Sequence, residues 1–152
     1  MTRPFVLSVA GLDPSGGAGL FADIKTFEAF DVHGLGVCSA LTRQNDVEFR
    51  GLDWVDGSRI LAQMEPLVER YDVGAMKIGV IESIESLLAV VRLARARRID
   101  VPVVWDPVFA PSAEGKFREP WLSGEFVQAC STVTLVTPNR PDALNAFNTE
   151  MR

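Results

Sequence analysis

Residues 5–27 read FVLSVAGLDPSGGAGLFADIKTF, and this stretch decides the fold class. An apolar run from Phe5 to Ala10 comes first, and a glycine-rich segment from Gly11 to Gly19 follows it. After Gly19, apolar residues recur at helical spacing as far as Phe30. A buried strand that enters a helix through a turn is the repeating unit of α/β folds, so the stretch predicts such a fold.

The rest of the chain repeats this alternation of strand and helix. Further strands are predicted at Leu35–Leu41, Val73–Ile78, Pro102–Trp105 and Thr132–Val136, none of which alternates between polar and apolar residues. Such continuous runs are typical of strands buried on both faces of a parallel sheet. Helices are predicted at residues 60–71, from Ser83 as N-cap through residue 94, at Pro120–Ala129 and after Asn139, with loops at Asn45–Gly57 and Pro107–Glu119. Residues 1–152 thus form one α/β domain in this interpretation.

One expected helix contains a proline, Pro66, which would kink or break it. Another ends in the arginine cluster Arg92, Arg95, Arg97 and Arg98. This cluster could bind an anion, but basic residues at a helix C-terminus also complement the helix dipole, which favours a solvated surface.

Composition and charge limit the classes of function that this sequence could have. The chain has 20 acidic and 15 basic residues, a formal charge of −5 and 47% hydrophobic residues, which argues against disorder and against nucleic-acid binding. No apolar run could span a membrane and the N-terminus lacks a signal-peptide pattern, so we expect a cytoplasmic protein. Cys38 and Cys130 lack metal-ligand spacing and are expected to be buried thiols. His33 is the sole histidine, which argues against a hydrolase triad and favours chemistry that needs few special side chains, such as phosphoryl transfer.

Ligands of open α/β sheets bind beyond the carboxyl ends of the strands, where the first candidates lie. The segment Gly11–Gly19 either brings backbone N–H groups close to an anionic ligand or is only a flexible turn. Asp23 falls within the apolar stripe of the first helix, so its carboxylate must find a partner or shift its pKa. The alternative is an acid near the helix start that reaches solvent.

Later strand ends carry five more candidates. Gln44 could pair with a heterocycle through two hydrogen bonds, or lie at the surface. Lys77 could hold a phosphate or extend to solvent, and Asp106 could organise Mg²⁺ through water or simply end a strand. Asn139 and Asp142 could lie near nucleotide phosphates and hydrated metal, although Asn139 also suits a helix N-cap.

Five collinear segments resemble the hydroxymethylpyrimidine/phosphomethylpyrimidine kinases of thiamine biosynthesis, which are ribokinase-like enzymes. These segments are AGLDPSGGAG with ADIKTF (residues 10–19 and 22–27), ALTRQN (40–45), KIG (77–79), DPV (106–108) and TPNRPD (137–142). The resemblance implies a doubly wound, mostly parallel sheet with flanking helices. It also implies MgATP-dependent phosphorylation of 4-amino-5-hydroxymethyl-2-methylpyrimidine and then of its monophosphate.

The resemblance also assigns roles to residues. Gln44 would pair with the amino and ring nitrogens of the pyrimidine. The remaining pocket residues would be Gly11, Ala18, Asp23, Val80 and Val108. The residues near ATP and Mg²⁺ would be Lys77, Asp106, Asn139 and Asp142, with no direct metal ligand among them.

The chain departs from the family pattern in several places. Leu12 stands where a small hydroxyl residue is common, and Asp142 is shorter than the usual glutamate. Arg43 replaces a small neighbour of Gln44. Its side chain could crowd the mouth of the pocket or change the charge there. The sequence contains no Gly-Thr-Gly-Cys loop, which forms the anion hole in the family. We therefore expect a kinase domain that is incomplete at its C-terminus. Without the anion hole, this chain should be almost inactive alone. The catalytic residues would lie in that missing part. A pyridoxal/pyridoxine-type kinase and a non-catalytic pyrimidine-binding fragment remain alternatives, and the family habit suggests a homodimer.

Overall fold

The computed structural model describes residues 3–98, 100–109 and 123–139. In chain order the elements are β1 (Phe5–Leu12), α1 (Gly19–Ala29), β2 (His33–Gln44), β3 (Phe49–Trp54), α2 (Gly57–Arg70), β4 (Val73–Ile78), α3 (Ile84–Arg97), β5 (Val103–Trp105), α4 (Ser123–Thr132) and β6 (Leu135–Val136). The strands form one sheet in the order β3-β2-β1-β4-β5-β6. All neighbouring pairs are parallel except β2 and β3.

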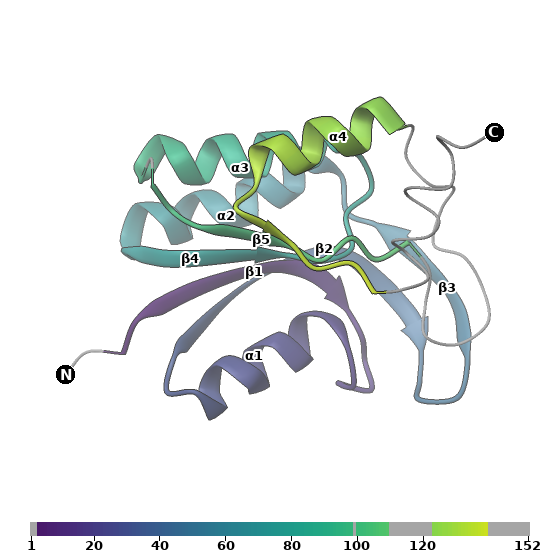
Figure 1. Cartoon of the computed structure of the whole chain (residues 1–152). Helices are drawn as coiled ribbons and strands as arrows, with labels where there is room; N and C mark the ends of the chain where they lie inside the picture. Colours follow the sequence, from purple (N-terminus) through teal and green to yellow (C-terminus); the bar gives the residue numbers. More distant parts are fainter. Residues whose placement is uncertain (1–2, 99, 110–122, 140–152) are drawn as a thin grey trace.

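The sheet has helices on both faces, which confirms the predicted doubly wound architecture. Helices α2, α3 and α4 cover one face, and α1 lies on the other (Figure 1). From β1 the chain passes through α1 to β2 on one side, and it later returns to β4 on the other side of β1. The strand order therefore reverses between β1 and β4, and the crevice at the carboxyl ends of these two strands is where such sheets bind ligands.

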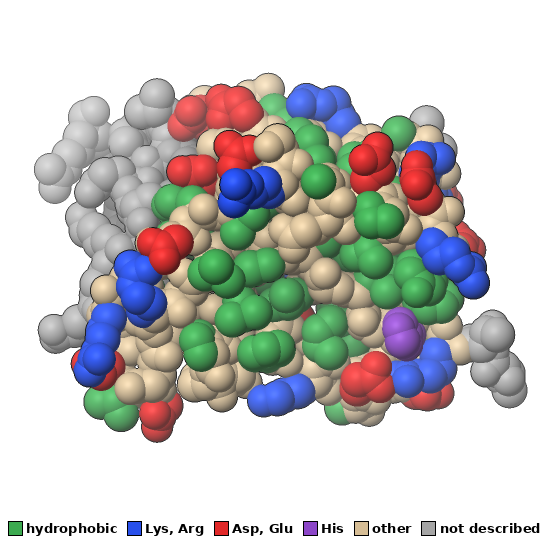
Figure 2. All heavy atoms as spheres, turned by 180° about the vertical axis from the view of Figure 1, so that it is seen from behind, with side chains coloured by type: hydrophobic (Ala, Val, Ile, Leu, Met, Phe, Trp, Pro, Cys, Tyr) green, Lys and Arg blue, Asp and Glu red, His purple; other side chains and the backbone are tan. Residues whose placement is uncertain are grey.

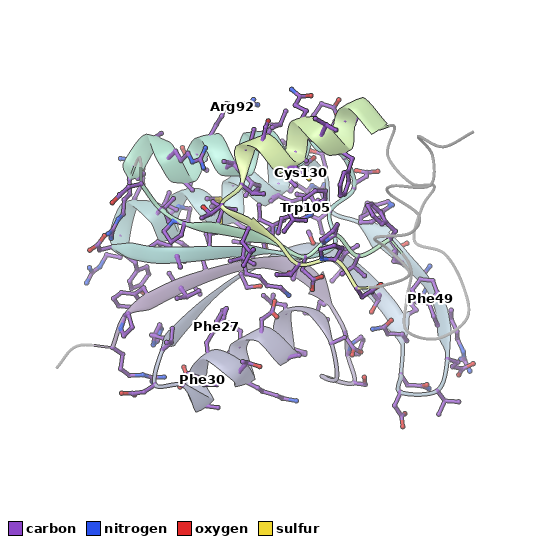
Figure 3. All side chains as sticks on the ribbon, in the orientation of Figure 1. Phe27, Phe30, Phe49, Arg92, Trp105 and Cys130 are labelled. Carbon is purple, nitrogen blue, oxygen red and sulfur yellow. The ribbon has the colours of Figure 1, made fainter. Side chains whose placement is uncertain are left out.

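Most of the core lies between the sheet and the three-helix face. Its largest fully buried side chains include Leu7, Ile60, Met64, Leu87 and Trp105. Figure 3 shows Trp105 between the sheet and the helices, whereas Arg92 lies on the outer side of the helical layer. On the opposite face, Leu20 is the one residue of α1 that counts as buried, so the predicted apolar stripe is only partly covered by the described residues.

Three predicted elements differ from the structure. The expected loop Asn45–Gly57 contains strand β3, which pairs antiparallel with the end of β2. Pro66 lies inside α2 without ending it, because the helix buries Ile60, Met64 and Val68 and the lost backbone bond lies on its exposed side. Thr132 ends α4 instead of starting a strand.

The predicted N-cap Ser83 is confirmed, since its hydroxyl accepts a hydrogen bond from Ser86 N–H. The predicted helix after Asn139 lies outside the described residues.

The arginine cluster at the end of α3 is mostly a charged surface. Arg97 pairs with Glu69, and Arg98 pairs with Asp72 and Asp100. These ion pairs are exposed and contribute little to stability. None of the helices in the described part of the chain has the length and hydropathy needed to cross a bilayer.

Strand β2 is longer than the strand that covers its outer edge. Its pairs with β3 begin only at Ala40, and just before that point the side chain of Gln63 takes the place of a strand. The Gln63 amide accepts from Cys38 N–H and donates to Cys38 C=O, each at 3.0 Å. Seen from behind, hydrophobic side chains gather across the middle of this side of the molecule (Figure 2).

Replacing Gln63 with leucine is expected to lower the free energy of unfolding by about 2 kcal/mol, because two partly buried backbone groups lose their partner at once. Urea unfolding would measure the loss. The matched control is Gln128→Leu on the exposed side of α4, which should change stability by less than about 0.5 kcal/mol. Equal effects of the two substitutions would show that the Gln63 bridge does not stabilise the fold.

Candidate active site

The glycine-rich segment between β1 and α1 folds around the carboxylate of Asp13. Backbone φ is +73° at Gly16 and +56° at Gly19, values that favour glycine. Asp13 is only 4% exposed. Its carboxylate accepts hydrogen bonds from Ser15 N–H and Oγ, from Gly17 N–H at 3.1 Å and from Ala18 N–H at 2.9 Å. Two N–H groups at the start of α1 are thus already bound to an anion of the chain itself.

This arrangement bears on the two interpretations of the segment. The N–H groups of Gly17 and Ala18 already donate to Asp13 and are not free for a phosphate, and ligand contact elsewhere in the segment stays a prediction. The segment is an ordered turn whose conformation is fixed by hydrogen bonds to the Asp13 carboxylate. Burial raises the pKa of Asp13, but hydrogen bonds from Ser15, Gln44 and Ala18 outweigh it and leave the pKa below its usual value.

Gln44, at the end of β2, lies beside this turn. Its side chain lies near enough to the Asp13 carboxylate to help lower the pKa of that carboxyl, and the same carboxylate holds Gly17 and Ala18. Gln44 also lines a shallow pocket of about 340 Å³, together with Pro14, Thr42, Arg43, Asn45, Glu48 and Arg50. The amide and the glycine-rich turn therefore lie at one rim of the sheet, and the role of Gln44 in ligand binding stays a prediction.

Two apolar candidates lie at the switch point itself. Gly11 is buried at the end of β1, and a Cβ added there would lie 2.7 Å from the Val80 side chain. Val80 is held after β4 because its carbonyl accepts a 2.5 Å hydrogen bond from the buried Ser39 hydroxyl. Val108 follows β5 and is half-buried. Gly11 and Val80 are thus in contact, as one pocket wall would require.

Asp23 has found the partner that its position in the apolar stripe demands. Lys77 Nζ lies 2.8 Å from Asp23 Oδ1 and 2.9 Å from Oδ2, and the fully buried Ser8 hydroxyl donates to Oδ2 at 2.6 Å. The Asp23 side chain is 14% exposed, so it is not the solvent-facing acid of the alternative interpretation. Lys77, likewise, binds a carboxylate of the chain instead of extending freely into solvent.

Asp106, after β5, completes this charged group. Its Oδ2 lies 3.9 Å from Lys77 Nζ. Burial raises the pKa of Asp106, the ammonium of Lys77 counteracts that effect, and the negative charge of Asp23 adds to it. Helix α1 and strands β1, β4 and β5 thus bring Ser8, Asp23, Lys77 and Asp106 together at one edge of the sheet.

The candidates after β6 are only partly described. Thr137 N–H donates to Trp105 C=O at 2.9 Å, which keeps the segment after β6 beside the end of β5. Asn139 is exposed two residues later, and Asp142 lies outside the described residues. Among the described residues, no group of three or more His, Cys, Asp or Glu side chains is placed to hold a metal ion.

Arg43, the departure next to Gln44, is directed along the β-hairpin. It pairs with Asp53, and its guanidinium fills the space left by the missing side chain of Gly51. Arg43 is exposed. It therefore borders the shallow pocket of Gln44 with its charge already paired.

Two residues that hold the candidate site together were missed by the sequence interpretation. Asp13 looks like an ordinary turn former, although an aspartate followed by small residues with free N–H groups is a signal for such a turn. Ser8 is a single hydroxyl in an otherwise apolar strand, and that contrast is the signal that could have found it. Both bind the backbone or side chains of predicted site residues.

Comparisons with known proteins agree with the fold. A family model described as phosphomethylpyrimidine kinase matches residues 13–152. The hydroxymethylpyrimidine/phosphomethylpyrimidine kinase of Rhizobium meliloti is 35% identical over 138 residues, which are 90% of this chain and 51% of that protein. The chain spans about half the length of the curated relatives it matches.

Solved structures give the same picture. The phosphomethylpyrimidine kinase of Clostridium difficile 630 superposes with a TM-score of 0.78 at 29% identity, covering 95% of this chain and 64% of that one. The pyridoxal kinase of Staphylococcus aureus in complex with AMP-PCP has a TM-score of 0.77 at 23% identity, covering 98% of this chain and 54% of that one, and shares the fold.

Proposed function

Because the chain belongs to the phosphomethylpyrimidine kinase family, we propose that it serves the ATP-dependent phosphorylation of 4-amino-5-hydroxymethyl-2-methylpyrimidine and of its monophosphate in thiamine biosynthesis. Its part is to bind the pyrimidine. Gln44 pairs with the amino and ring nitrogens, and Gly11, Ala18, Asp23, Val80 and Val108 line the pocket.

One observation carries this proposal. The side-chain amide of Gln44 lies beside the glycine-rich turn, at the carboxyl edge of a sheet whose strand order reverses between β1 and β4. An amide offers both a donor and an acceptor to the edge of a flat heterocycle. The side chain of Val80 fills the space that the missing side chain of Gly11 leaves, so these two residues pack as one wall beside the turn.

The described residues fit a limited role toward ATP and Mg²⁺. Asp106 is a single carboxylate with 34% of its side chain exposed, which suits contact through water with a Mg²⁺ ion that water and phosphate oxygens would ligate. Bound MgATP would supply the phosphoryl group. Lys77, Asp106, Asn139 and Asp142 would lie near its phosphates, and the N–H groups of Gly17 and Ala18 would not take part because Asp13 occupies them.

Gln44→Ala is expected to weaken binding of the hydroxymethylpyrimidine to the full chain by about tenfold or more, because two hydrogen bonds to the ring are lost. Isothermal titration calorimetry measures the dissociation constant. The control is Gln128→Ala, an exposed glutamine on α4 that should leave the affinity unchanged. Unchanged affinity in the Gln44 variant would overturn the proposed recognition.

Two other functions share the same fold. Similarity to pyridoxal kinases favours a vitamin kinase of the pyridoxal/pyridoxine type as the second candidate. Tighter binding of pyridoxal than of the pyrimidine would support it. Occupation of the turn's N–H groups by Asp13 favours a non-catalytic pyrimidine-binding protein, for which pyrimidine affinity without ATP affinity is the expected result.

We also propose that the chain acts in the cytoplasm and forms a homodimer. The outer edge of β2 before Ala40 is not covered by β3, and Phe21 and Phe30 of the neighbouring α1 segment are 44% and 78% exposed. Open strand edges and exposed aromatic residues favour association. Sedimentation equilibrium of the chain distinguishes a dimer from a monomer.

A further inference from the structure

Lys77 stands between two carboxylates that belong to different parts of the site. Two of its N–H groups reach Asp23 on α1, and its Nζ lies 3.9 Å from Asp106 after β5. The lysine is 24% exposed at its side chain, so solvent screens these charges only in part. It lies next to the crevice between β1 and β4 because its strand pairs with β1, with Lys77 opposite Ser8.

The ion pair sets the charge of this edge. With all three groups ionised, Asp23 and Asp106 contribute two negative charges and Lys77 one positive charge, which leaves −1. Both oxygens of Asp23 are bound by Lys77, and one is also bound by Ser8. Asp23 is therefore a neutralised, fixed wall. Without Lys77, the same wall would carry an unpaired charge toward any ligand.

No other described cation can replace Lys77 here. Lys25, also on α1, is exposed and donates to Gly16 C=O, and Arg43 on the hairpin pairs with Asp53. A phosphate group that entered this edge would meet the charges of Asp23 and Asp106, and Lys77 is the one cation in the described part of the chain placed to offset them. A neutral alcohol would not be affected by the balance in the same way.

We propose that Lys77 is the specificity-determining positioning residue that lets this site accept a phosphorylated pyrimidine as well as the neutral alcohol. It acts through Asp23, whose charge it neutralises and whose carboxylate it holds against Ser8. This inference rests on the proposed function, because it assumes that a pyrimidine occupies the pocket beside Asp23. It adds the reason why an acidic site can bind an anionic substrate.

The test compares the affinities of the full chain for the hydroxymethylpyrimidine and for its monophosphate by calorimetry. In Lys77→Met, we expect the monophosphate to bind about tenfold to a hundredfold more weakly, whereas the alcohol changes by less than about threefold. The double variant Lys77→Met/Asp23→Asn removes the negative charge of Asp23, which Lys77→Met alone would leave unpaired. It should return the ratio of the two dissociation constants to within about threefold of the wild-type ratio.

Two further variants keep the test sharp. Lys77→Arg retains the positive charge and should preserve the ratio of the two dissociation constants. If Lys77→Met does not fold, the same ratio is measured in Lys77→Arg instead. Arg92→Met removes an exposed cation on the far side of the helical layer and should leave the ratio unchanged (Figure 3). Equal weakening of both ligands in Lys77→Met, or no recovery in the double variant, would overturn the inference. A wild-type chain that binds neither ligand would instead overturn the proposed function.

Discussion

Gly19→Ala is expected to lower the free energy of unfolding by at least about 3 kcal/mol. At this position φ is +56°, a region that costs an L side chain about 1–2 kcal/mol. In addition, a Cβ at Gly19 would lie 2.1 Å from the carbonyl oxygen of Gly11, which is backbone at the end of a central strand and cannot turn aside. Urea unfolding followed by circular dichroism would measure the loss.

The matched control is Gly124→Ala, at the beginning of α4. Among the described residues, a Cβ added to Gly124 would meet no atom within 4 Å beyond its chain neighbours and its own helix backbone, so the same chemical change should be neutral or stabilise the helix by up to about 1 kcal/mol. The Gly19 variant should also lose pyrimidine affinity, because the turn that Asp13 and Gln44 contact must move to relieve the clash. If both variants lowered stability equally, the close approach of Gly19 to Gly11 would not hold in solution.

The strands that could be predicted from the sequence are the ones whose signal is local. Continuous apolar runs gave β1, β2 and β4 close to their observed bounds, although β2 and β4 bury only some of their positions. Strand β3 was not predicted, because Arg50 and Asp53 are exposed in it and its stability comes from pairing with β2. Of the kink or break expected at Pro66, the break does not occur, because tertiary burial of α2 outweighs a local preference.

In the candidate site too, features with a local sequence signal could be predicted, and features that depend on tertiary structure could not. The position of Asp23 in an apolar stripe demanded a partner, and the structure supplies one. That the partner is Lys77, 54 residues later, follows only from the sheet order that places β4 beside β1. The occupation of the Gly17 and Ala18 N–H groups was equally invisible, because a ligand and an internal carboxylate satisfy the same donors.

Asp13→Asn is expected to destabilise the chain by about 2–3 kcal/mol at neutral pH. The carboxylate accepts hydrogen bonds on both oxygens, from Ser15 N–H and hydroxyl and from two backbone N–H groups before α1. An asparagine of the same size must turn its NH₂ group toward some of these donors and leaves them unsatisfied in a site that is only 4% exposed. The matched control is Asp31→Asn in an exposed turn, with an expected effect below about 0.5 kcal/mol.

The pH dependence of this difference separates a charge effect from a packing effect. The pKa of folded Asp13 lies below its usual value because the hydrogen bonds outweigh the effect of burial, whereas in the unfolded chain it is close to about 3.9. Its stabilising contribution is therefore complete above the unfolded pKa and is lost as the pH falls through the lower, folded pKa. Unfolding measured from pH 7 down to pH 2 should show the stability of wild type approaching that of Asp13→Asn only below about pH 4. A gap between the two proteins that stayed constant over this range would mean that the turn depends on the shape of Asp13 and not on its charge.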